Sequence, residues 1–393
     1  MQELDALIRE AGDWNQPAGH GGGAARPPAT PEAEVSRIMQ ICNACRYCEG
    51  FCAVFPAMTR RLEFGDADAH YLANLCHNCG ACLYACQYAP PHEFAVNVPQ
   101  AMAEVRLRTY KRHAWPHAFG ALYERNGLVL SLALAAGMAL FLILALAARG
   151  TLWGAAPGGN FYDVFSHGFM VSIFAPVFLF VVFALGVSVA RFWRESDPGP
   201  ASAAAAADAT GAVASLRYLG GGHEKGCNNE SDRFSLARRH CHHATFYGFV
   251  LCFLATSVAT IYHYAFKLEA PYAYTSLPTV LGMLGGIGLT VGTAGLFWLH
   301  LKRNPDQGDV RQKPMDLGFI ALLAIVAVTG LALAVLRATS VMPILLAIHL
   351  GAVLAFFLTI PYGKFAHGPM RAAALFKWSI ERRQPNRLGL SDD

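Results

Sequence analysis

Eight of the eleven cysteines of this chain fall into two runs with the same internal spacing. The first run contains Cys42, Cys45, Cys48 and Cys52, and the second contains Cys76, Cys79, Cys82 and Cys86. Three thiolates at positions i, i+3 and i+6 of a tight loop can face one cubane, while a fourth thiolate from elsewhere in the chain closes the site. The spacing therefore predicts two [4Fe–4S] clusters.

The two runs are expected to exchange their fourth ligands, as the cysteine runs of two-cluster ferredoxins do. One cluster would be bound by Cys42, Cys45, Cys48 and Cys86, and the other by Cys76, Cys79, Cys82 and Cys52. Structural zinc sites also use Cys-x2-Cys pairs, but two complete four-cysteine runs favour iron–sulfur clusters. A disulfide framework is disfavoured because nothing in the sequence indicates an oxidising compartment.

The rest of the chain is more apolar than soluble proteins usually are. Hydrophobic residues make up 54% of the 393 residues and charged residues only 15%. Six windows of about twenty apolar residues are each long enough to cross a bilayer as a helix. They cover residues 128–148, 168–190, 244–266, 278–301, 316–337 and 341–362. Buried helices of a soluble protein explain these windows poorly, because all six are nearly free of charge.

The basic residues predict how the windows are oriented. Lysine and arginine number five in 101–127, seven in 191–243, four in 302–315 and six from 363 onward, against one in or beside each opposite turn. The positive-inside rule then places both termini in the cytoplasm of a multi-pass inner-membrane protein. The chain starts with acidic residues and has no apolar core there, so no signal peptide is expected. A net charge of +4 is too small to indicate nucleic-acid binding.

The sequence thus predicts an all-α protein, in which a helical two-cluster ferredoxin-like domain on the cytoplasmic side precedes a six-helix transmembrane bundle. Helical spacing occurs in 32–42, 59–75 and 96–108, with Thr30 and Pro31 as a cap and first-turn pair. The expected parts are a flexible tail (1–31) with a short amphipathic helix in 1–11, the ferredoxin-like domain (32–110), a connector with two transmembrane helices (111–190), a cytoplasmic loop (191–243), four further transmembrane helices (244–367) and a cytoplasmic tail (368–393).

The cytoplasmic loop begins with an alanine-rich run, 201–214, for which disorder is expected, and continues with a glycine-rich motif at 217–222. The motif could bind a ligand, lie against the cluster domain or serve as a structured connector, and we favour the connector. Cys227, Cys241 and His223 could in principle bind a metal, but their spacing matches no site of known type.

Histidines near the ends of the apolar windows are candidate haem ligands, because ionisable groups at membrane depth are costly and mark functional sites. A b-type haem bound by two imidazoles needs them at similar depth on facing helices. Depth pairs His263 with His349 near the outer face and His243 with His367 near the inner face.

An alternative inner pair is His300 with either His242 or His243. The step from His243 to His263 corresponds to roughly 30 Å of helix, a long separation for two haems in one bilayer. One haem is therefore favoured, and a second remains open. A single histidine at a helix end, such as His167, His242 or His300, can equally be an interfacial residue in contact with lipid headgroups.

Several motifs carry a family resemblance. The segment CNACRYCEGFCAVFPA from Cys42 to Ala57, the CHNC motif from Cys76 and the RYLGGG motif from Arg217 resemble the tricarballylate-utilisation protein B (citrate-utilisation B-type) family. The resemblance extends from about residue 34 through the last apolar window. The proline that often follows the fourth cysteine of bacterial ferredoxins is replaced by Ala53 and Gln87. This departure favours an all-helical module, similar to those of succinate dehydrogenase and heterodisulfide reductase, over a sheet-based ferredoxin fold.

The resemblance implies a membrane iron–sulfur protein that reoxidises the reduced flavin of a separate FAD-dependent tricarballylate dehydrogenase and delivers the electrons to the quinone pool. The helical part is similar, more loosely, to the haem-b subunits of nitrate reductases. The expected function is electron transfer through two [4Fe–4S] clusters, by way of haem b, to quinone in the lipid. The chain would be the redox subunit of a flavoprotein:quinone oxidoreductase system. No catalytic acid or base is assigned, because chemistry on the organic acid belongs to the partner.

A different class of function is a redox sensor or a transport-associated membrane protein for tricarboxylates. Against it, the apolar windows lack the arginine or lysine expected to hold several carboxylates, and no repeat of broken helices is visible. The sequence leaves open the organic substrate, the number of haems, the quinone site and the formation of homo-oligomers.

Overall fold

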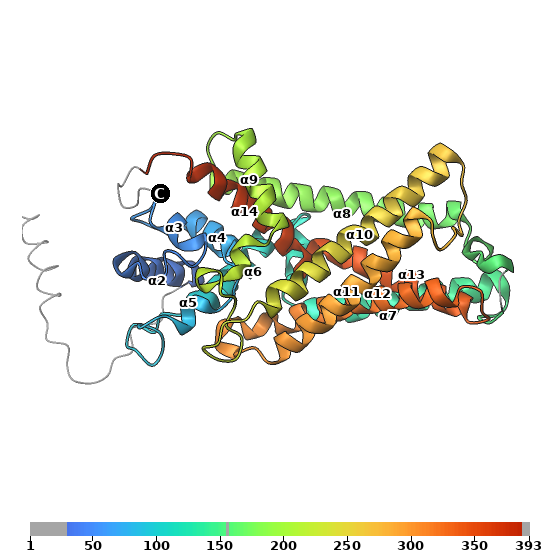
Figure 1. Cartoon of the computed structure of the whole chain (residues 1–393), viewed down its shortest axis with the longest axis horizontal. Helices are drawn as coiled ribbons and strands as arrows, with labels where there is room; N and C mark the ends of the chain where they lie inside the picture. The colour runs from blue at the N-terminus through green and yellow to red at the C-terminus, as the bar shows by residue number, and fades with distance from the viewer. Residues whose placement is uncertain (1–29, 155–156, 387–393) are drawn as a thin grey trace, which may run out of the picture.

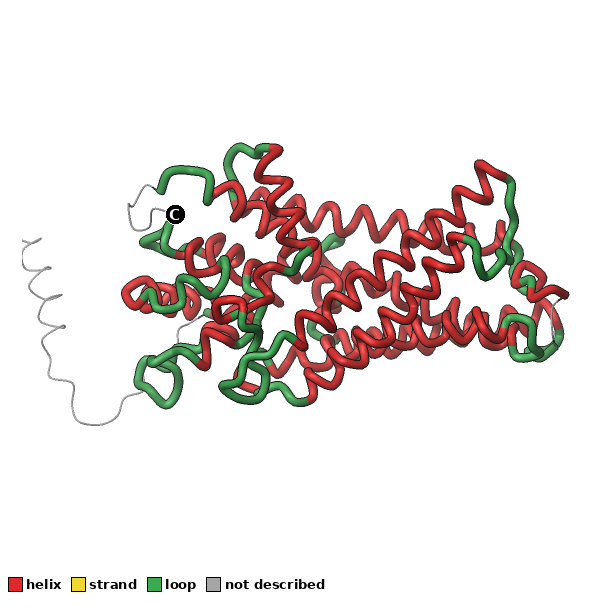
Figure 2. The backbone as a smooth tube through the Cα atoms, in the orientation of Figure 1, coloured by secondary structure: helices red, strands yellow, loops and turns green. Residues whose placement is uncertain are grey.

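The structure is a computed structural model that describes residues 30–154 and 157–386. Within these ranges the chain is helical and contains no strand, apart from one isolated bridge between Cys227 and Ser235. Short helices gather at one end of the molecule, and long helices run from there to the other end (Figures 1 and 2). The all-α prediction is confirmed, whereas the helix expected in residues 1–11 lies outside the described residues.

The end domain, called the cluster domain below, contains both cysteine runs. Its helices are α2 (Pro31–Cys45), α3 (Val54–Met58), α4 (Asp66–Leu75), α5 (Ala81–Tyr84) and α6 (Val98–His113). Thr30 caps α2, since its Oγ1 accepts a hydrogen bond of 3.1 Å from the amide of Ala33, and Pro31 occupies the first turn. The predicted cap and first-turn pair is thereby confirmed.

The core of the cluster domain is formed by one face each of α2, α4 and α6. Ile38 and Met39 of α2, Leu72 of α4, and Met102 and Val105 of α6 are at most 1% exposed. Each buried side chain of this size contributes about 1.5–3 kcal/mol relative to its exposed state. This packing holds the loops that carry the cysteines in place.

Six long helices confirm the six apolar windows. They are α7 (Asn126–Arg149), α8 (His167–Ser196), α10 (Ala237–Phe266), α11 (Leu277–Leu301), α12 (Lys313–Leu336) and α13 (Met342–Thr359). Each belongs to a segment long and apolar enough to cross a membrane. Large apolar side chains such as Leu179, Phe183 and Val291 are more than half exposed, which is the arrangement expected when lipid is the surrounding solvent.

Small residues let the long helices approach closely. A Cβ atom placed on Gly137 of α7 would lie 2.5 Å from the carbonyl oxygen of Gly351 in α13. A Cβ atom on Gly248 of α10 would lie 2.6 Å from the amide nitrogen of Leu289 in α11. These two helix pairs therefore depend on glycine at their crossing points.

The alanine-rich run differs from the prediction of disorder, because it forms helix α9 (Ala203–Ala214). Ser202 caps this helix by accepting a hydrogen bond of 3.1 Å from the amide of Ala205, and Ala205 and Ala209 are buried. Alanine has the highest helix propensity, so a short face of small residues is enough to dock such a helix. The alanine-rich composition of the segment led to the prediction of disorder instead of a helix.

The segment predicted as a C-terminal tail begins with helix α14 (His367–Glu381), which turns back over the cluster domain (Figure 1). Asp208 of α9 joins the two helices, since it accepts a hydrogen bond of 2.6 Å from Ser379. Short 3-10 helices complete the described chain at His117–Tyr123, Pro157–Gly159, Phe161–Asp163, Arg217–Gly220, Gly222–Glu224, Pro305–Gln307, Val310–Gln312, Ile360–Tyr362 and Lys364–Ala366.

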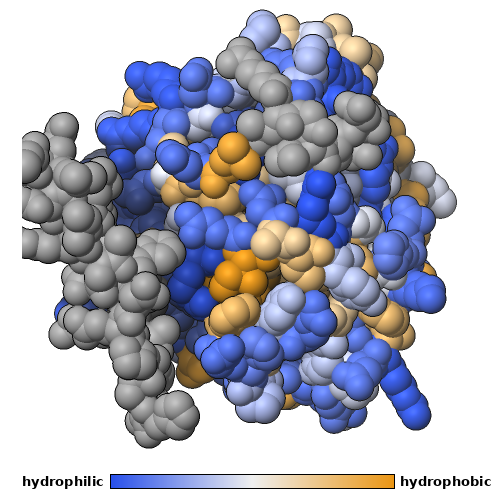
Figure 3. Space-filling model, turned by 90° about the vertical axis from the view of Figure 1, so that its left-hand side faces the viewer, coloured by the Kyte–Doolittle hydropathy of each residue, from blue (hydrophilic) through white to orange (hydrophobic). Residues whose placement is uncertain are grey.

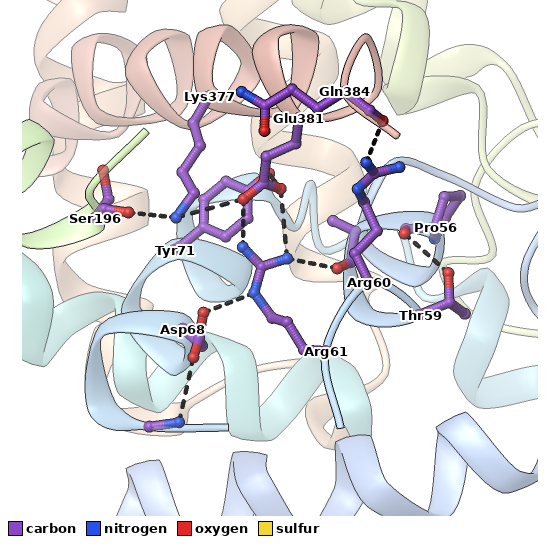
Figure 4. A network of polar contacts seen from close by, with 12 residues as sticks. Pro56, Thr59, Arg60, Arg61, Asp68, Tyr71, Ser196, Lys377, Glu381 and Gln384 are labelled. Atoms are coloured by element: carbon purple, nitrogen blue, oxygen red, sulfur yellow. Dashed lines mark hydrogen bonds and ion pairs between the residues drawn. The ribbon is translucent and has the colours of Figure 1, made fainter. Parts of the chain in front are cut away.

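A polar network fixes α14 to the cluster domain (Figure 4). Glu381 forms an ion pair with Arg61 and accepts a hydrogen bond of 3.1 Å from the hydroxyl of Tyr71. Lys377 lies 4.4 Å from the centre of the Tyr71 ring and donates a hydrogen bond to the carbonyl of Ser196 at the end of α8. The network thus ties together the cluster domain, α14 and a membrane helix.

Candidate functional site

The first predicted ligand set comes together in one surface pocket of the cluster domain. Cys42, Cys45, Cys48 and Cys86 all line this pocket. Burial, and then the neighbouring thiols of Cys48 and Cys86, raise the pKa of Cys42 to about 12. Such crowding of thiols around a pocket is the arrangement that a cluster bound by four thiolates requires, since each bound thiolate carries a negative charge that the iron neutralises.

The second predicted set lies deeper. Burial, followed by the thiols of Cys79 and Cys76, holds the pKa of Cys52 well above its usual range. The pKa of Cys82 is raised for the same reasons and by the same two neighbours. Cys48 of the first set is also close enough to interact with Cys79. The structure therefore places the two sets side by side, each with its fourth cysteine from the other run.

Backbone geometry positions these thiols. Helix α2 ends at Cys45, and Arg46 then adopts a left-handed conformation with φ of 56°, which turns the chain toward Cys48. Gly80 has φ of 81°, and a Cβ atom there would lie 2.8 Å from the carbonyl oxygen of Asn228. The amide of Asn78 donates to the sulfur of Cys76 at 3.3 Å, as amides near iron–sulfur ligands commonly do.

Within the described part of the chain, no three His, Cys, Asp or Glu side chains converge on a point suited to one metal ion. A single tetrahedral zinc with Zn–S bonds of about 2.3 Å draws its sulfurs within about 3.8 Å of one another. A four-iron cluster holds its four thiolates further apart, at the corners of a cubane. The donor set of eight thiols in two adjoining groups fits two such clusters.

The glycine-rich motif of the loop between α8 and α10 lies over the second set. A Cβ atom on Gly221 would lie 3.3 Å from the sulfur of Cys79. The amide of Asn228 donates to the carbonyl of Cys79 at 3.1 Å, and Cys227 packs against Cys79 while its thiol donates to the carbonyl of Leu219 at 3.4 Å. Of the three roles considered for this motif, contact with the cluster domain is observed, while the structured connector that we favoured and a ligand-binding role stay predictions.

The three residues considered for a separate metal site have different neighbours. Cys227 contacts Cys79, whereas Cys241 lies against α11, where a Cβ atom on Gly295 would be 2.4 Å from its sulfur. The ring of His223 packs edge-on against Phe51, with centroids 5.0 Å apart. Each of the three is therefore explained by a different contact.

The proposed outer histidine pair is not formed. The ring of His263 stacks on His167 with centroids 3.9 Å apart, and Nδ1 of His349 lies 3.0 Å from the hydroxyl of Thr329. The contact between Phe249 of α10 and Phe356 of α13 explains why. Measured from the depth of this contact, His263 lies about 21 Å along α10, and His349 lies about 10 Å along α13 in the same direction. The two histidines are therefore at different depths.

The inner pair involves the neighbour of the expected residue. His242, and not His243, faces His367, with ring centroids 6.2 Å apart and ring planes at 80°. Nδ1 of His367 is at hydrogen-bond distance from the carbonyl of Lys364, whereas Nδ1 of His242 is buried without a hydrogen-bond partner. The recorded ring contact of His243 is with Tyr247.

This inner pair fits a haem iron. Two imidazoles bound on opposite sides of a metal, with metal–nitrogen bonds of about 2.0–2.1 Å, place their ring centroids about 6.3 Å apart. The hydrogen bond at Nδ1 of His367 leaves Nε2 free for a metal, which is the usual tautomer of a ligating histidine. His300 fits the role of a haem ligand less well, because its neighbours are Asp316, Arg303 and other charged groups.

Sequence reasoning missed a set of arginines that hold the second cysteine run. Arg106 of α6 and Arg371 of α14 each donate a hydrogen bond of 2.8 Å to the carbonyl of Cys76. Arg238 of α10 donates one of 2.7 Å to the carbonyl of Asn78. The three residues are scattered along the chain, so no spacing in the sequence could have revealed them.

Comparison with known proteins agrees with this architecture. The family model described as "Citrate utilization protein B" matches residues 122–387, and the model described as "Citrate utilization protein B Fer4-like domain" matches residues 35–112. The chain belongs to the citrate utilization protein B family. A curated Escherichia coli protein named "Citrate utilization protein B" is 60% identical to it over 393 residues, which cover all of both chains. No solved structure matches.

Membership of the citrate utilization protein B family confirms the resemblance drawn from the cysteine and glycine motifs. The Fer4-like match contains all eight cysteines of the two runs, and the second match contains all six apolar helices. The protein therefore combines an iron–sulfur domain of ferredoxin-like type with a multi-pass membrane domain, as expected of an electron-transfer protein.

Proposed function

We propose that this protein accepts electrons from a reduced flavin of a separate, tricarballylate dehydrogenase-like enzyme and passes them through two [4Fe–4S] clusters to quinone in the membrane. The observation that carries the proposal is the pair of adjoining four-thiol groups at the junction with six apolar helices. Cys42, Cys45, Cys48 and Cys86 would hold one cluster, and Cys76, Cys79, Cys82 and Cys52 the other.

Burial supports a direction for electron flow. The first set lines a pocket open to the surface, beside Tyr47, which is 68% exposed. Cys76 of the second set is 7% exposed, and its carbonyl accepts hydrogen bonds from Arg106 of α6 and Arg371 of α14. The first cluster would therefore receive electrons and the second would deliver them toward the membrane helices.

The end face of the cluster domain offers a surface for the electron donor. Figure 3 shows apolar side chains gathered within a mainly hydrophilic face at this end. Exposed side chains of the cluster domain include Leu62 at 63% and Phe94 at 43%. Apolar groups ringed by polar ones are the usual composition of a protein docking site. This composition supports a soluble flavoprotein as the partner.

A b-type haem would be bound by His242 and His367. When bound, it supplies a one-electron carrier between the second cluster and quinone. His77, which follows Cys76 in sequence, interacts electrostatically with His242 and so links the second set to the histidine pair. His243, His263, His300 and His349 are not part of this proposal, and a single haem is therefore proposed.

The proposed topology keeps the cluster domain, α9 and α14 on the cytoplasmic side of the inner membrane. These three parts contact one another at the same end of the helices, where the basic residues also concentrate. A cytoplasmic flavoprotein would then reach the first cluster, and quinone would be reduced within the lipid. Bond-breaking on the organic acid would remain the task of the flavoprotein.

The test is electron transfer in membranes that contain the Cys79→Ser variant together with the dehydrogenase. Loss of a thiolate from the second set should reduce electron flow from the dehydrogenase to quinone by at least a hundredfold, because one of the electron carriers between them is lost. The turnover of the dehydrogenase with an artificial electron acceptor should not change. Quinone reduction at the wild-type rate in this variant would refute the proposal.

A further inference from the structure

Four arginines and a lysine lie at the junction between the cluster domain and the membrane helices, one of them buried and the other four partly buried. They lie on or next to α6, α10, α11 and α14. The group, called the cationic seat below, consists of Arg106, Arg238, Arg303, Lys364 and Arg371. Arg106 is 3% exposed, and burial lowers the pKa of Arg303 and of Arg371 to about 10, so these last two stay charged at neutral pH.

The cationic seat is attached to the second cysteine run. As described above, Arg106 and Arg371 share the carbonyl of Cys76, and Arg238 holds the carbonyl of Asn78. Arg303 is close enough to interact electrostatically with Cys76. The guanidinium groups therefore face the loop that carries the second ligand set.

The positive charge of the cationic seat is not balanced within the described chain. Its one recorded ion pair joins Lys364 to Asp316 at 2.7 Å. Arg371 has Arg106 and Arg238 among its charged neighbours. Arg303 has the same two arginines as neighbours, and the one carboxylate near it is Asp316, which already pairs with Lys364. Nε of Arg371 is buried and has no hydrogen-bond partner. The facing histidines, His77 and His242, bring no negative charge.

Positive charges that are partly withdrawn from water and have no carboxylate partner are destabilising, so a cluster of them indicates that a bound anion completes the site. A [4Fe–4S] cluster with four thiolate ligands carries a net negative charge, which increases by one on reduction. Nearby cations stabilise the reduced form more than the oxidised form and so raise the reduction potential.

The first set has no such surplus. Arg46, which lines its pocket, forms an ion pair of 3.1 Å with Glu49. Arg37 of α2 forms one of 2.7 Å with Glu34. Both of these arginines therefore have a carboxylate partner three residues away.

We propose that the cationic seat binds the negative charge of the second cluster and raises its reduction potential above that of the first. This inference rests on the proposed function, since it assumes that both clusters are present. One electron leaves the first cluster, which is oxidised, and reduces the second, with no transfer of atoms. Electrons are thereby drawn from the protein surface toward the membrane.

The test is a redox titration of the purified full chain, followed by the electron paramagnetic resonance signals of the reduced clusters. The variants Arg371→Gln and Arg238→Gln should each shift the midpoint potential of one cluster to lower values. The equilibrium share of electrons on that cluster should fall about tenfold for each charge removed. The potential of the other cluster should change much less.

Two further variants make the outcome unambiguous. Cys45→Ser alters the signal of the first cluster and so identifies it, while Arg37→Gln removes an exposed, paired arginine and should shift neither potential. If Arg371→Gln does not fold, Arg238→Gln and the charge-preserving Arg371→Lys still decide the question. Unchanged potentials in both Arg371→Gln and Arg238→Gln would overturn this inference but not the proposed function. Absence of cluster signals from the wild type would instead overturn the proposed function.

Discussion

At the level of single residues, His242 and His243 show how one step along a helix decides which side chain faces His367. His242 and His243 are adjacent in sequence, and successive residues of a helix point about 100° apart. The rotation of α10 about its axis decides which of them faces His367, and packing against α11 sets that rotation through the contact of Gly248 with Leu289. The sequence alone does not contain this information.

Adjacent histidines provide a matched test of the haem proposal. The variant His242→Ala should abolish the reduced-minus-oxidised α band of a b-type haem, because one of the two axial ligands is lost. The control His243→Ala removes an imidazole from the same turn of α10 and should retain the band. Difference spectra of membranes, normalised to the amount of protein, measure both.

The converse result, with the band lost in His243→Ala and kept in His242→Ala, would contradict the assignment. The cysteines differ in this respect, because spacing alone predicts how they group. Cys86 lies near Cys42, and Cys52 lies near Cys79, as the predicted exchange of fourth ligands requires.

At the level of elements, α14 is the helix that the sequence revealed least. Apolar windows identify the long helices because lipid is their solvent, whereas α14 buries a face against parts of the chain that are distant in sequence, such as Asp208, which is 171 residues from Ser379. Its apolar residues contact α9 and the cluster domain, and only the folded molecule brings these together. The same holds for α9, whose alanine-rich composition suggested disorder.

Helix α14 should be held mainly by Glu381. Replacing this residue by glutamine removes the negative charge that Arg61 and Lys377 share. The side chains of Arg61 and Glu381 are only 13% and 14% exposed, so the charge of Arg61 is left largely buried without its partner. Breaking a largely buried ion pair costs about 3 kcal/mol. The free energy of local opening, measured by hydrogen exchange of the α14 amides, should decrease by that amount.

An exposed ion pair supplies the control for this prediction. Glu230 lies 4.0 Å from Lys302, and its side chain is 67% exposed. The variant Glu230→Gln should change the opening free energy of α14 by less than about 0.5 kcal/mol. If Glu381→Gln protected α14 as well as the wild type does, the network of Figure 4 would not be what anchors this helix.

At the level of the whole molecule, composition and periodicity were sufficient to predict an iron–sulfur domain attached to six apolar helices. Both predictions depend on local signals, namely cysteine spacing and runs of apolar residues. The way in which the two domains join was not predictable, because the junction is formed by residues from α6, α8, α10 and α14. At this junction the arginines from α6, α10 and α14 place positive charge beside the second ligand set.

The junction also gives the molecule a polarity. The ligand set nearer the surface lies beside paired charges, and the set nearer the membrane lies beside unpaired cations. An electron carrier with this arrangement favours movement in one direction without a moving part. The account therefore requires that both clusters be present in the same chain.

The most direct test of that requirement is the content of non-haem iron, acid-labile sulfide and haem in one anaerobically purified preparation, each expressed per polypeptide. Two [4Fe–4S] clusters and one b-type haem predict about eight non-haem irons, about eight sulfides and about one haem. A preparation that contained zinc in place of iron, or about four irons and four sulfides with every cysteine intact, would contradict the account.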